Sequence, residues 1–339
     1  TTIKKSSDYF NTKLYTGNQS STHAVTGVGF EPSLTWLKIR TGAGSHYLYD
    51  AIRGVTKSIS SDTTSAELSN TYFSSFDTDG FTLGSASNNV NGAYNYASWN
   101  WLANGAGSAN TDGSISSTVS ANTTSGFSIV TVANVGSANF TFGHGLGVAP
   151  SWVLAKSRDG GKWNNYFKSL GAGYTIQLPE TGAKISNTAI WQNTNPTSSV
   201  VYSNGDQLDA NESYVFYCFA EKQGYSKFGS YTGNGNADGT FVYTGFKPAF
   251  FVVKPYSTTG NWYCWDSKRS PINEIDGQYL ELDASGAEAS TSGVVDLDFL
   301  SNGVKLRNTG GGFNGSGVSF IYMAFAEQPL VGDNPATAR

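Results

Sequence analysis

Three lysines stand at the same place in three related stretches of the sequence. Each lies six residues after the proline of a Gly-x-x-Pro segment, and together they are Lys38, Lys156 and Lys254. On an extended strand, each lysine shares a face with the apolar residues two and four positions before it. Such a lysine is either a ligand anchor or a rim residue whose aliphatic stem covers the core while the ammonium reaches water. The sequence leaves both interpretations open.

An aromatic residue followed by a charged one recurs after each lysine. The charged residues are Asp50, Lys168 and Asp266, and each stands 18 positions after its proline. An ion pair with the repeated lysine is therefore expected in the first and third stretches but not in the second. The gapless spacing indicates one fold unit that occurs three times.

Aromatic residues also cluster in the segment that carries this pair. Alternation along a strand places about half of such rings outward, and exposed Tyr or Trp rings amid Asn and Ser can stack on sugar rings. Packing in a second sheet face, or between repeats, is the alternative. The candidate binding residues in these clusters are Tyr49, Trp163, Tyr166, Trp262 and Trp265.

Other potentially reactive residues do not recur between the units. Asp77 and Asp79 have the spacing that begins a calcium loop, but the matching segments, Ser203-Asn204-Gly205 and Ser301-Asn302-Gly303, keep only the turn. Since Asn-Gly and Asp-Gly mark tight turns, we predict a hairpin at each of these three places.

The histidines and cysteines also stand at unrelated positions. No Gly-x-Ser-x-Gly segment accompanies the glycine-rich stretch around His144, and Cys218 and Cys264 lie in apolar runs that favour buried free thiols. We therefore predict no catalytic residue, no metal site and no cofactor.

The elements that position these residues are short strands. Forty glycines punctuate β-branched and aromatic runs, and no long window has helical periodicity. Each unit closes with an apolar strand, at 96–102, 214–220 and 320–326, and the second of these has the composition of a strand in the middle of a sheet. We predict an all-β chain of three tandem antiparallel β-sandwiches, jelly-roll or concanavalin-like, with a pseudo-threefold arrangement as one way to assemble them. The predicted segments are an arm at 1–7, sandwiches at 8–106, 126–222 and 225–327, a linker or edge strand at 107–125, and a tail at 328–339.

Composition limits the partners of the chain. The net charge is −4 and there is no stripe of Lys and Arg, which argues against nucleic acid. No apolar run approaches 18 residues, so no membrane-spanning segment is expected. Lys4 and Lys5 form a short basic arm suited to docking against an acidic surface.

Several motifs together resemble a known group of proteins. They are Tyr15-Thr16-Gly17-Asn18, the segment from Thr26 to Pro32, the segment from Asp79 to Gly84, and the stretch from Phe219 to Gly235. These are similar to a repeated domain of uncharacterised virion structural proteins from tailed phages of marine bacteria, including cyanophages and pelagiphages. Related chains also tend to end on a short Ala-Arg tail like Ala338-Arg339. The resemblance implies a virion protein of the tail-fibre or decoration type and carries no catalytic residue.

The expected function is therefore a non-enzymatic structural role on the exterior of a phage particle made in the host cytoplasm. The protein would act as a capsid decoration, an accessory appendage or a tail-fibre component, with other virion proteins as partners. It would be a monomer with three similar units or a homotrimer. A glycan-binding adhesin that contacts host surface sugars is the alternative. A polysaccharide depolymerase is a weaker one, because it needs two facing carboxylates and the acids here do not recur.

Overall fold

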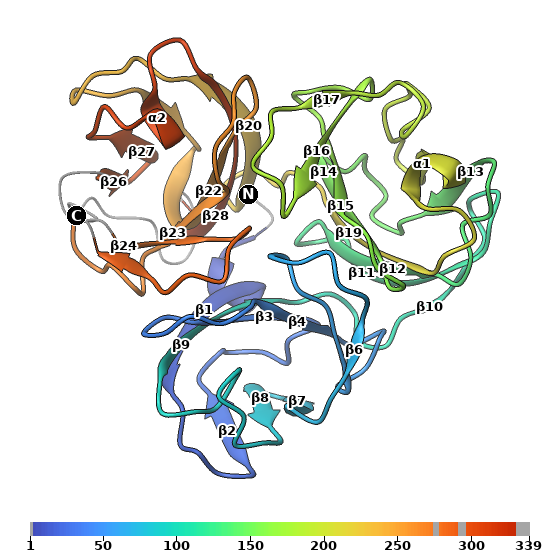
Figure 1. Ribbon diagram of the computed structural model, residues 1–339, viewed down its shortest axis with the longest axis horizontal. Helices are drawn as coiled ribbons and strands as arrows, with labels where there is room; N and C mark the ends of the chain where they lie inside the picture. The colour runs from blue at the N-terminus through green and yellow to red at the C-terminus, as the bar shows by residue number, and fades with distance from the viewer. Residues whose placement is uncertain (1–2, 274–277, 291–295, 330–339) are drawn as a thin grey trace.

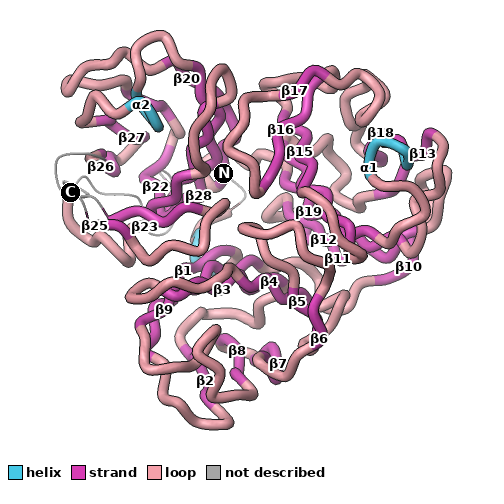
Figure 2. Tube along the Cα trace, viewed as in Figure 1, coloured by secondary structure: helices cyan, strands magenta, loops and turns pink. Residues whose placement is uncertain are grey.

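The computed structural model describes residues 3–273, 278–290 and 296–329. Nearly all regular structure is β, and three lobes surround a common centre (Figure 1). The predicted tail and the Ala338-Arg339 ending lie outside the described residues, apart from the first two positions of the tail. Figure 2 shows how little helix separates the strands and loops.

The first lobe holds nine strands after a short 3-10 helix at Ser6–Asp8. Its elements are β1 (Phe10–Thr16), β2 (His23–Thr26), β3 (Leu34–Ile39), β4 (Tyr47–Asp50), β5 (Lys57–Ser58), β6 (Leu68–Ser69), β7 (Phe73–Asp77), β8 (Gly80–Leu83) and β9 (Asn95–Trp101).

The second lobe contains one short helix among its strands. Its elements are β10 (Ser108–Asn110), β11 (Ser117–Asn122), β12 (Phe127–Val132), β13 (Asn139–Gly143), β14 (Trp152–Ser157), β15 (Trp163–Phe167), β16 (Tyr174–Leu178), β17 (Ile185–Ser186), β18 (Val200–Asn204), α1 (Gly205–Leu208) and β19 (Tyr214–Phe219).

The third lobe completes the chain. Its elements are β20 (Ser226–Thr232), β21 (Phe241–Tyr243), β22 (Phe246–Pro255), β23 (Tyr263–Asp266), β24 (Gln278–Glu281), β25 (Ala289–Ser290), β26 (Leu297–Leu300), β27 (Gly303–Leu306), α2 (Gly311–Asn314) and β28 (Ser319–Pro329).

Each lobe places one antiparallel sheet toward the centre. The inner strand orders correspond: β1-β9-β3-β4 in the first lobe, β12-β19-β14-β15 in the second and β20-β28-β22-β23 in the third. The closing strand of each unit, β9, β19 or β28, therefore has a neighbour on both sides, and the predicted middle position of 214–220 is confirmed. In the second lobe, β11 and β10 extend the sheet beyond β12, so segment 107–125 includes two strands, of which β10 forms the edge of the sheet.

Smaller outer sheets make each lobe a two-layered sandwich. Their orders are β2-β8-β7, β13-β18 and β21-β27-β26. A local apolar core lies between the layers of each lobe; in the first lobe it contains Leu37, Tyr49, Phe73 and Phe81. The all-β sandwich expectation is confirmed, while the unit boundaries and the pseudo-threefold axis stay predictions.

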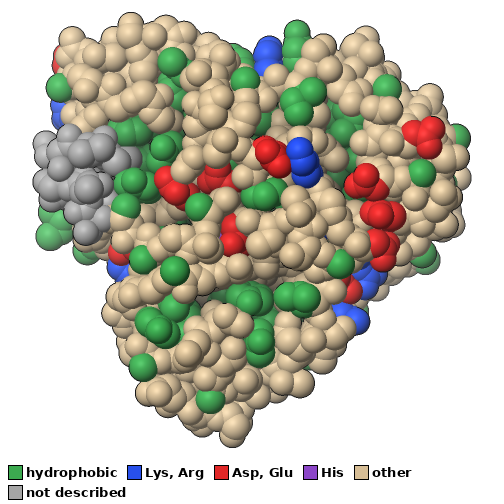
Figure 3. Space-filling model, in the orientation of Figure 1, with side chains coloured by type: hydrophobic (Ala, Val, Ile, Leu, Met, Phe, Trp, Pro, Cys, Tyr) green, Lys and Arg blue, Asp and Glu red, His purple; other side chains and the backbone are tan. Residues whose placement is uncertain are grey.

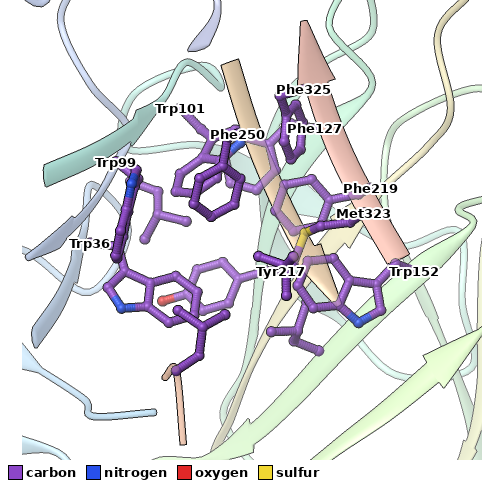
Figure 4. Packing of buried hydrophobic residues seen from close by; sticks show 14 of the residues in the cluster. Trp36, Trp99, Trp101, Phe127, Trp152, Tyr217, Phe219, Phe250, Met323 and Phe325 are labelled. Atoms are coloured by element: carbon purple, nitrogen blue, oxygen red, sulfur yellow. The ribbon is translucent and has the colours of Figure 1, made fainter. Parts of the chain in front are cut away.

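The inner faces of all three sheets meet in one aromatic core (Figure 4). The residues in Figure 4 come from every lobe, among them Trp36, Trp99 and Trp101 from the first, Trp152, Tyr217 and Phe219 from the second, and Phe250, Met323 and Phe325 from the third. The space between these side chains is about 10 Å³, which is too small for a ligand. The lobes are therefore parts of one packed body, joined by burial of apolar surface.

Two of the three predicted hairpin turns are present. Asp77 and Gly80 end and begin the paired strands β7 and β8, and Leu300 and Gly303 do the same for β26 and β27. The prediction for Asn204-Gly205 was wrong. Asn204 instead caps α1, because its side-chain oxygen accepts from the Gln207 N–H, a use for which Asn is as well suited as it is for a turn.

Candidate functional site

The three repeated lysines are all buried and bind backbone carbonyls. The Lys38 Nζ donates to the carbonyls of Gly44, Ser285 and Gly286 at 2.8, 3.2 and 2.7 Å. The Lys254 Nζ donates to Thr181 and Gly260 at 2.8 and 2.5 Å. Since the ammonium groups do not reach water, the rim interpretation is wrong. The same contacts argue against a ligand anchor, because the ammonium groups point into the protein.

The lysine contacts join one lobe to the next. Ser285 and Gly286 belong to the third lobe and bind Lys38 of the first, whereas Thr181 belongs to the second lobe and binds Lys254 of the third. Each of these two lysines thus fastens a loop that arrives from the neighbouring lobe. We call these contact regions joints.

The third joint, between the first and second lobes, is made differently. Lys156 donates to the carbonyls of Ser157 and Gly160 in its own lobe, at 2.7 and 2.8 Å. The first lobe reaches this loop through the Glu67 N–H, which donates to the Arg158 carbonyl at 2.8 Å. Lys156 therefore shapes the loop that receives the neighbour rather than binding the neighbour itself.

The residue two positions after each lysine completes its joint. The guanidinium of Arg40 forms two hydrogen bonds with Glu288, at 2.9 and 2.8 Å, and Arg158 does the same with Glu67. At the corresponding place between the second and third lobes stands Tyr256, whose ring has the Lys184 ammonium 5.3 Å from its centroid.

A second layer of buried charge supports two of the joints. The Arg53 Nε donates to Asp50 at 2.5 Å and its Nη1 donates to Glu67 at 3.2 Å. The Tyr217 hydroxyl of the second lobe also donates to Asp50, at 2.7 Å, so this aspartate links two lobes.

The third lobe repeats this arrangement. Arg269 donates to Asp266 at 2.5 Å and to Glu288 at 3.1 Å, and the Trp99 indole of the first lobe donates to Asp266 at 3.0 Å. The expected ion pairs of Lys38 with Asp50 and of Lys254 with Asp266 are therefore wrong. Each aspartate instead pairs with an arginine three residues later, because the turn that follows the strand brings that side chain back.

The second lobe lacks the whole set at once. Lys168 replaces the aspartate and is exposed, and Gly171 stands where the arginine is found in the other units. Lys184 stands where the first and third lobes have Glu67 and Glu288, and its ammonium lies 3.8 Å from the centroid of the Tyr174 ring. Loss of the aspartate alone would leave a buried guanidinium without its carboxylate partner. The aspartate, the arginine and the glutamate are therefore absent together.

Burial controls the ionisation of the lysines. Desolvation lowers the pKa of Lys38, Lys156 and Lys254 to about 8 in each case. Nearby carboxylates act against this shift, Asp62 beside Lys38 and Asp283 beside Lys254. Burial also raises the pKa of Asp283 to about 6. These shifted groups lie inside joints, so their pKa values reflect structural burial.

The candidate sugar-stacking aromatics are internal. Tyr49, Trp163, Tyr166, Trp262 and Trp265 are all buried, and the expectation that about half of the clustered rings point outward was wrong for them. The rings on the inner face of the sheets, Trp163 and Trp262, pack in the central core. Those on the other face, Tyr49, Tyr166 and Trp265, pack in the core between the two sheets of their own lobe. With apolar layers on both faces of the strand, alternation does not expose a ring.

The basic arm lies against the centre with its charges exposed. Lys4 and Lys5 are exposed, whereas Ile3 between them and the chain start is buried in the central core. Lys5 forms an ion pair with Asp8 at 2.9 Å. The arm is therefore anchored and leaves Lys4 and Lys5 on the surface.

The remaining candidates have local roles. Asp79 accepts from the N–H groups of Gly27 and Gly29 at 3.0 and 2.6 Å, which ties the β7–β8 turn to the loop before β3. Cys218 and Cys264 are buried free thiols, as predicted, and burial raises the pKa of Cys218 to about 12. In the described part of the chain, no group of three or more His, Cys, Asp and Glu is placed to hold a metal ion. No helix within the described ranges is long and apolar enough to cross a membrane.

Sequence reasoning missed the ion pairs across the joints, Arg40 with Glu288 and Arg158 with Glu67, and the arginines beneath them, Arg53 and Arg269. A signal for some of them was present. The sequence Asp-x-x-Arg occurs at Asp50 and at Asp266, and an arginine stands two positions after the lysine in the first and second units. The glutamates gave no such signal, since their distance from the arginine differs between units.

The fold and its joints define a three-lobed all-β protein whose recurring ionisable residues hold the lobes together. A family model described as a domain of unknown function, DUF7483, matches residues 5–329, and the chain belongs to that family. The match treats the three lobes as a single domain. Comparisons with curated proteins and with solved structures found no match.

Proposed function

We propose that this protein is a non-enzymatic structural component on the exterior of a tailed-phage particle. The observation that carries the proposal is the use of the recurring charged residues: Lys38, Lys254, Asp50 and Asp266 all bind across or beneath the joints. Catalytic groups need access to substrate, whereas these groups are enclosed and make one rigid body from three lobes.

The form of the molecule suits such a role. The face of the molecule in Figure 3 carries few charged side chains, and several acidic ones lie near the meeting of the lobes. A broad, sparsely charged and rigid body is well adapted to lie on a particle surface. The resemblance of the sequence motifs to virion structural proteins of marine phages supports the same assignment.

Two positions on a particle fit the three lobes. As a monomer, the chain would match a local threefold position of a capsid as a decoration protein; as a homotrimer, it would form the head of a tail fibre or accessory appendage. Other virion proteins are the expected partners, and the exposed Lys4 and Lys5 suit docking against an acidic surface.

Electron microscopy of the intact virion, with a tag inserted in the exposed stretch 105–107, tests the proposal. We expect density for the tag on the outside of the capsid or the tail. Absence of the chain from purified particles, with abundant chain in the lysate, would refute it. A capsid position would exclude the fibre form, and a tail position would exclude decoration.

One observation favours glycan binding as a second candidate function. Tyr243 is 60% exposed. It borders a groove of about 220 Å³ that Glu221, Gln223, Lys227 and Thr244 also line. An exposed ring beside polar side chains is a suitable platform for a sugar. A glycan array with the wild-type protein and with Tyr243→Ala tests this function, and an array without any signal for the wild type would remove it.

A further inference from the structure

The three inner sheets begin with corresponding strands, but their outer edges differ. In the second lobe, β11 pairs antiparallel with the outer edge of β12, so that Ser120 lies opposite Ile129. The corresponding first strands, β1 and β20, are the last strands of their sheets. Among the strands that the structure describes, one of these three edges is thus extended by added strands and the other two are not.

Hydrogen bonds at the strand ends identify which groups of β1 face its outer edge. The Leu102 N–H donates to the Tyr9 carbonyl, and the Gly17 N–H donates to the Tyr94 carbonyl. Because antiparallel pairs alternate, odd-numbered residues of β1 bond to β9 and even-numbered residues point away from it. The N–H and C=O groups of Thr12 and Leu14 therefore face outward.

The same reasoning gives the corresponding position in the second lobe. The Ala220 N–H donates to the Gly126 carbonyl, so odd-numbered residues of β12, including Ile129, face β11. Thr12 lies opposite Trp99, and Ile129 lies opposite Tyr217. Thr12 of β1 therefore corresponds to Ile129 of β12, which is the residue that lies opposite Ser120 of the added strand.

The two remaining edges are not equally open. In β20, the corresponding Phe228 N–H donates to the Glu221 carboxylate at 3.4 Å, so the lobe covers its own edge. In β1, no described residue accepts from the Thr12 N–H, and the buried Thr12 hydroxyl also has no partner within the described ranges. A buried hydroxyl without a hydrogen bond is costly, and an added strand would supply the missing partners.

Space for a strand is present beside this edge. Thr12 lines two adjacent grooves of about 230 and 270 Å³ between the first and third lobes. Lys268 lines both grooves and is exposed, and Lys13 lines the second. The Glu327 carboxylate in the first groove is already paired with Lys247 at 3.0 Å. The net charge on the walls is therefore positive.

We propose that the outer edge of β1 accepts an extended segment of a partner protein, which adds antiparallel to β1 as β11 adds to β12. The segment places a small hydroxyl residue opposite Thr12, as Ser120 lies opposite Ile129, and an acidic residue near Lys268. Backbone hydrogen bonds supply affinity, and the side chains on the two sides of the strand supply specificity.

The chain provides its own probe for this site. A synthetic peptide with the sequence of residues 115–124, which contains β11, and a version with Asn122→Asp are titrated into the intact protein by fluorescence anisotropy. We expect saturable binding of both peptides, at least threefold tighter for the Asp version because of Lys268, and loss of that preference in Lys268→Glu. Hydrogen exchange of the wild-type protein should slow at Thr12 when peptide is bound.

A proline substitution separates edge pairing from other contacts. Thr12→Pro removes an outward N–H without breaking the pairing with β9 and should lower peptide affinity at least tenfold. Ser230→Pro is the matched control, because it removes an outward N–H from β20, and it should leave the affinity unchanged. Thermal unfolding establishes that both variants are folded.

Two results would overturn the proposal: no saturable binding of either peptide, or binding without added protection at Thr12. Either would mean that Lys13 serves to keep strands away from an exposed edge. The proposal does not depend on the location of the protein in a virion, so the particle experiment and the peptide experiment can fail separately.

Discussion

Replacing Asp50 by Asn tests whether the buried charges hold the lobes together. Asp50 and Arg53 both have side chains 0% exposed, and the carboxylate accepts from Arg53 and from Tyr217 of the second lobe. The amide of the Asp50→Asn variant would keep one acceptor oxygen but would present an NH₂ group where the guanidinium and the Tyr217 hydroxyl now donate. The Arg53 charge would then be left with Glu67 as its remaining carboxylate partner.

The expected loss of unfolding free energy is large because the Arg53 guanidinium stays buried without its Asp50 partner. Removing one partner of a buried ion pair costs about 3–5 kcal/mol of unfolding free energy. Asp266→Asn should cost a similar amount, since Asp266 binds Arg269 and the Trp99 indole in the same manner. Lys168→Asn is the matched control at the corresponding position of the second lobe, where the side chain is exposed, and it should change stability by less than about 0.5 kcal/mol.

Equilibrium unfolding in urea, followed by tryptophan fluorescence, measures all three variants. The reasoning would be refuted if Asp50→Asn cost less than about 1 kcal/mol, which is the cost of an ordinary hydrogen bond. It would equally be refuted if Lys168→Asn were as damaging as Asp50→Asn, because the effect would then belong to the strand end and not to the buried pair.

Further outcomes follow from the same contacts. The wild-type protein should unfold in one transition by both fluorescence and circular dichroism, because the central core draws on all three lobes. Lys184→Ala should cost about 0.5–2 kcal/mol through loss of the ammonium–ring contacts with Tyr174 and Tyr256, measured by urea unfolding. Stability should rise from about pH 8 to pH 10, because the joint lysines release protons near pH 8 when folded and near 10.5 when unfolded. Above pH 10 the melting temperature should fall, since burial raises the pKa of Tyr217 above its ordinary value of 10.0 and the unfolded state loses its proton first. Cys218 and Cys264 should react with a thiol reagent only after unfolding.

The strands could be predicted from the sequence because their signals are local. The apolar runs after each proline and the runs that close each unit appear where expected, and 214–219 lies inside its sheet. The alternation of Leu34, Trp36 and Lys38 also gave the correct face. The interpretation of Lys38 as a rim residue was wrong because both faces of the sheet are covered, and the alternation within one strand does not reveal the second cover.

The joints could not be predicted because their partners are distant in sequence. Lys38 and the carbonyl of Gly286 are 248 positions apart, and Arg40 and Glu288 are equally far. A backbone carbonyl gives no sequence signal at all, so the acceptors of a buried lysine have to come from the folded structure. Asp50 was a reasonable partner for Lys38 by sequence. It pairs with Arg53 instead, because the planar guanidinium presents N–H groups in a geometry that matches a carboxylate.

The differences between the joints have a consequence for how such a molecule can change. In a trimer of identical subunits, any substitution alters all three contacts simultaneously, so each contact must tolerate it. Here covalent continuity gives every joint its own residues, and one joint uses an ammonium over an aromatic ring where the others use a guanidinium and a carboxylate. One lobe can therefore be modified for a new surface task while the other two keep the body assembled.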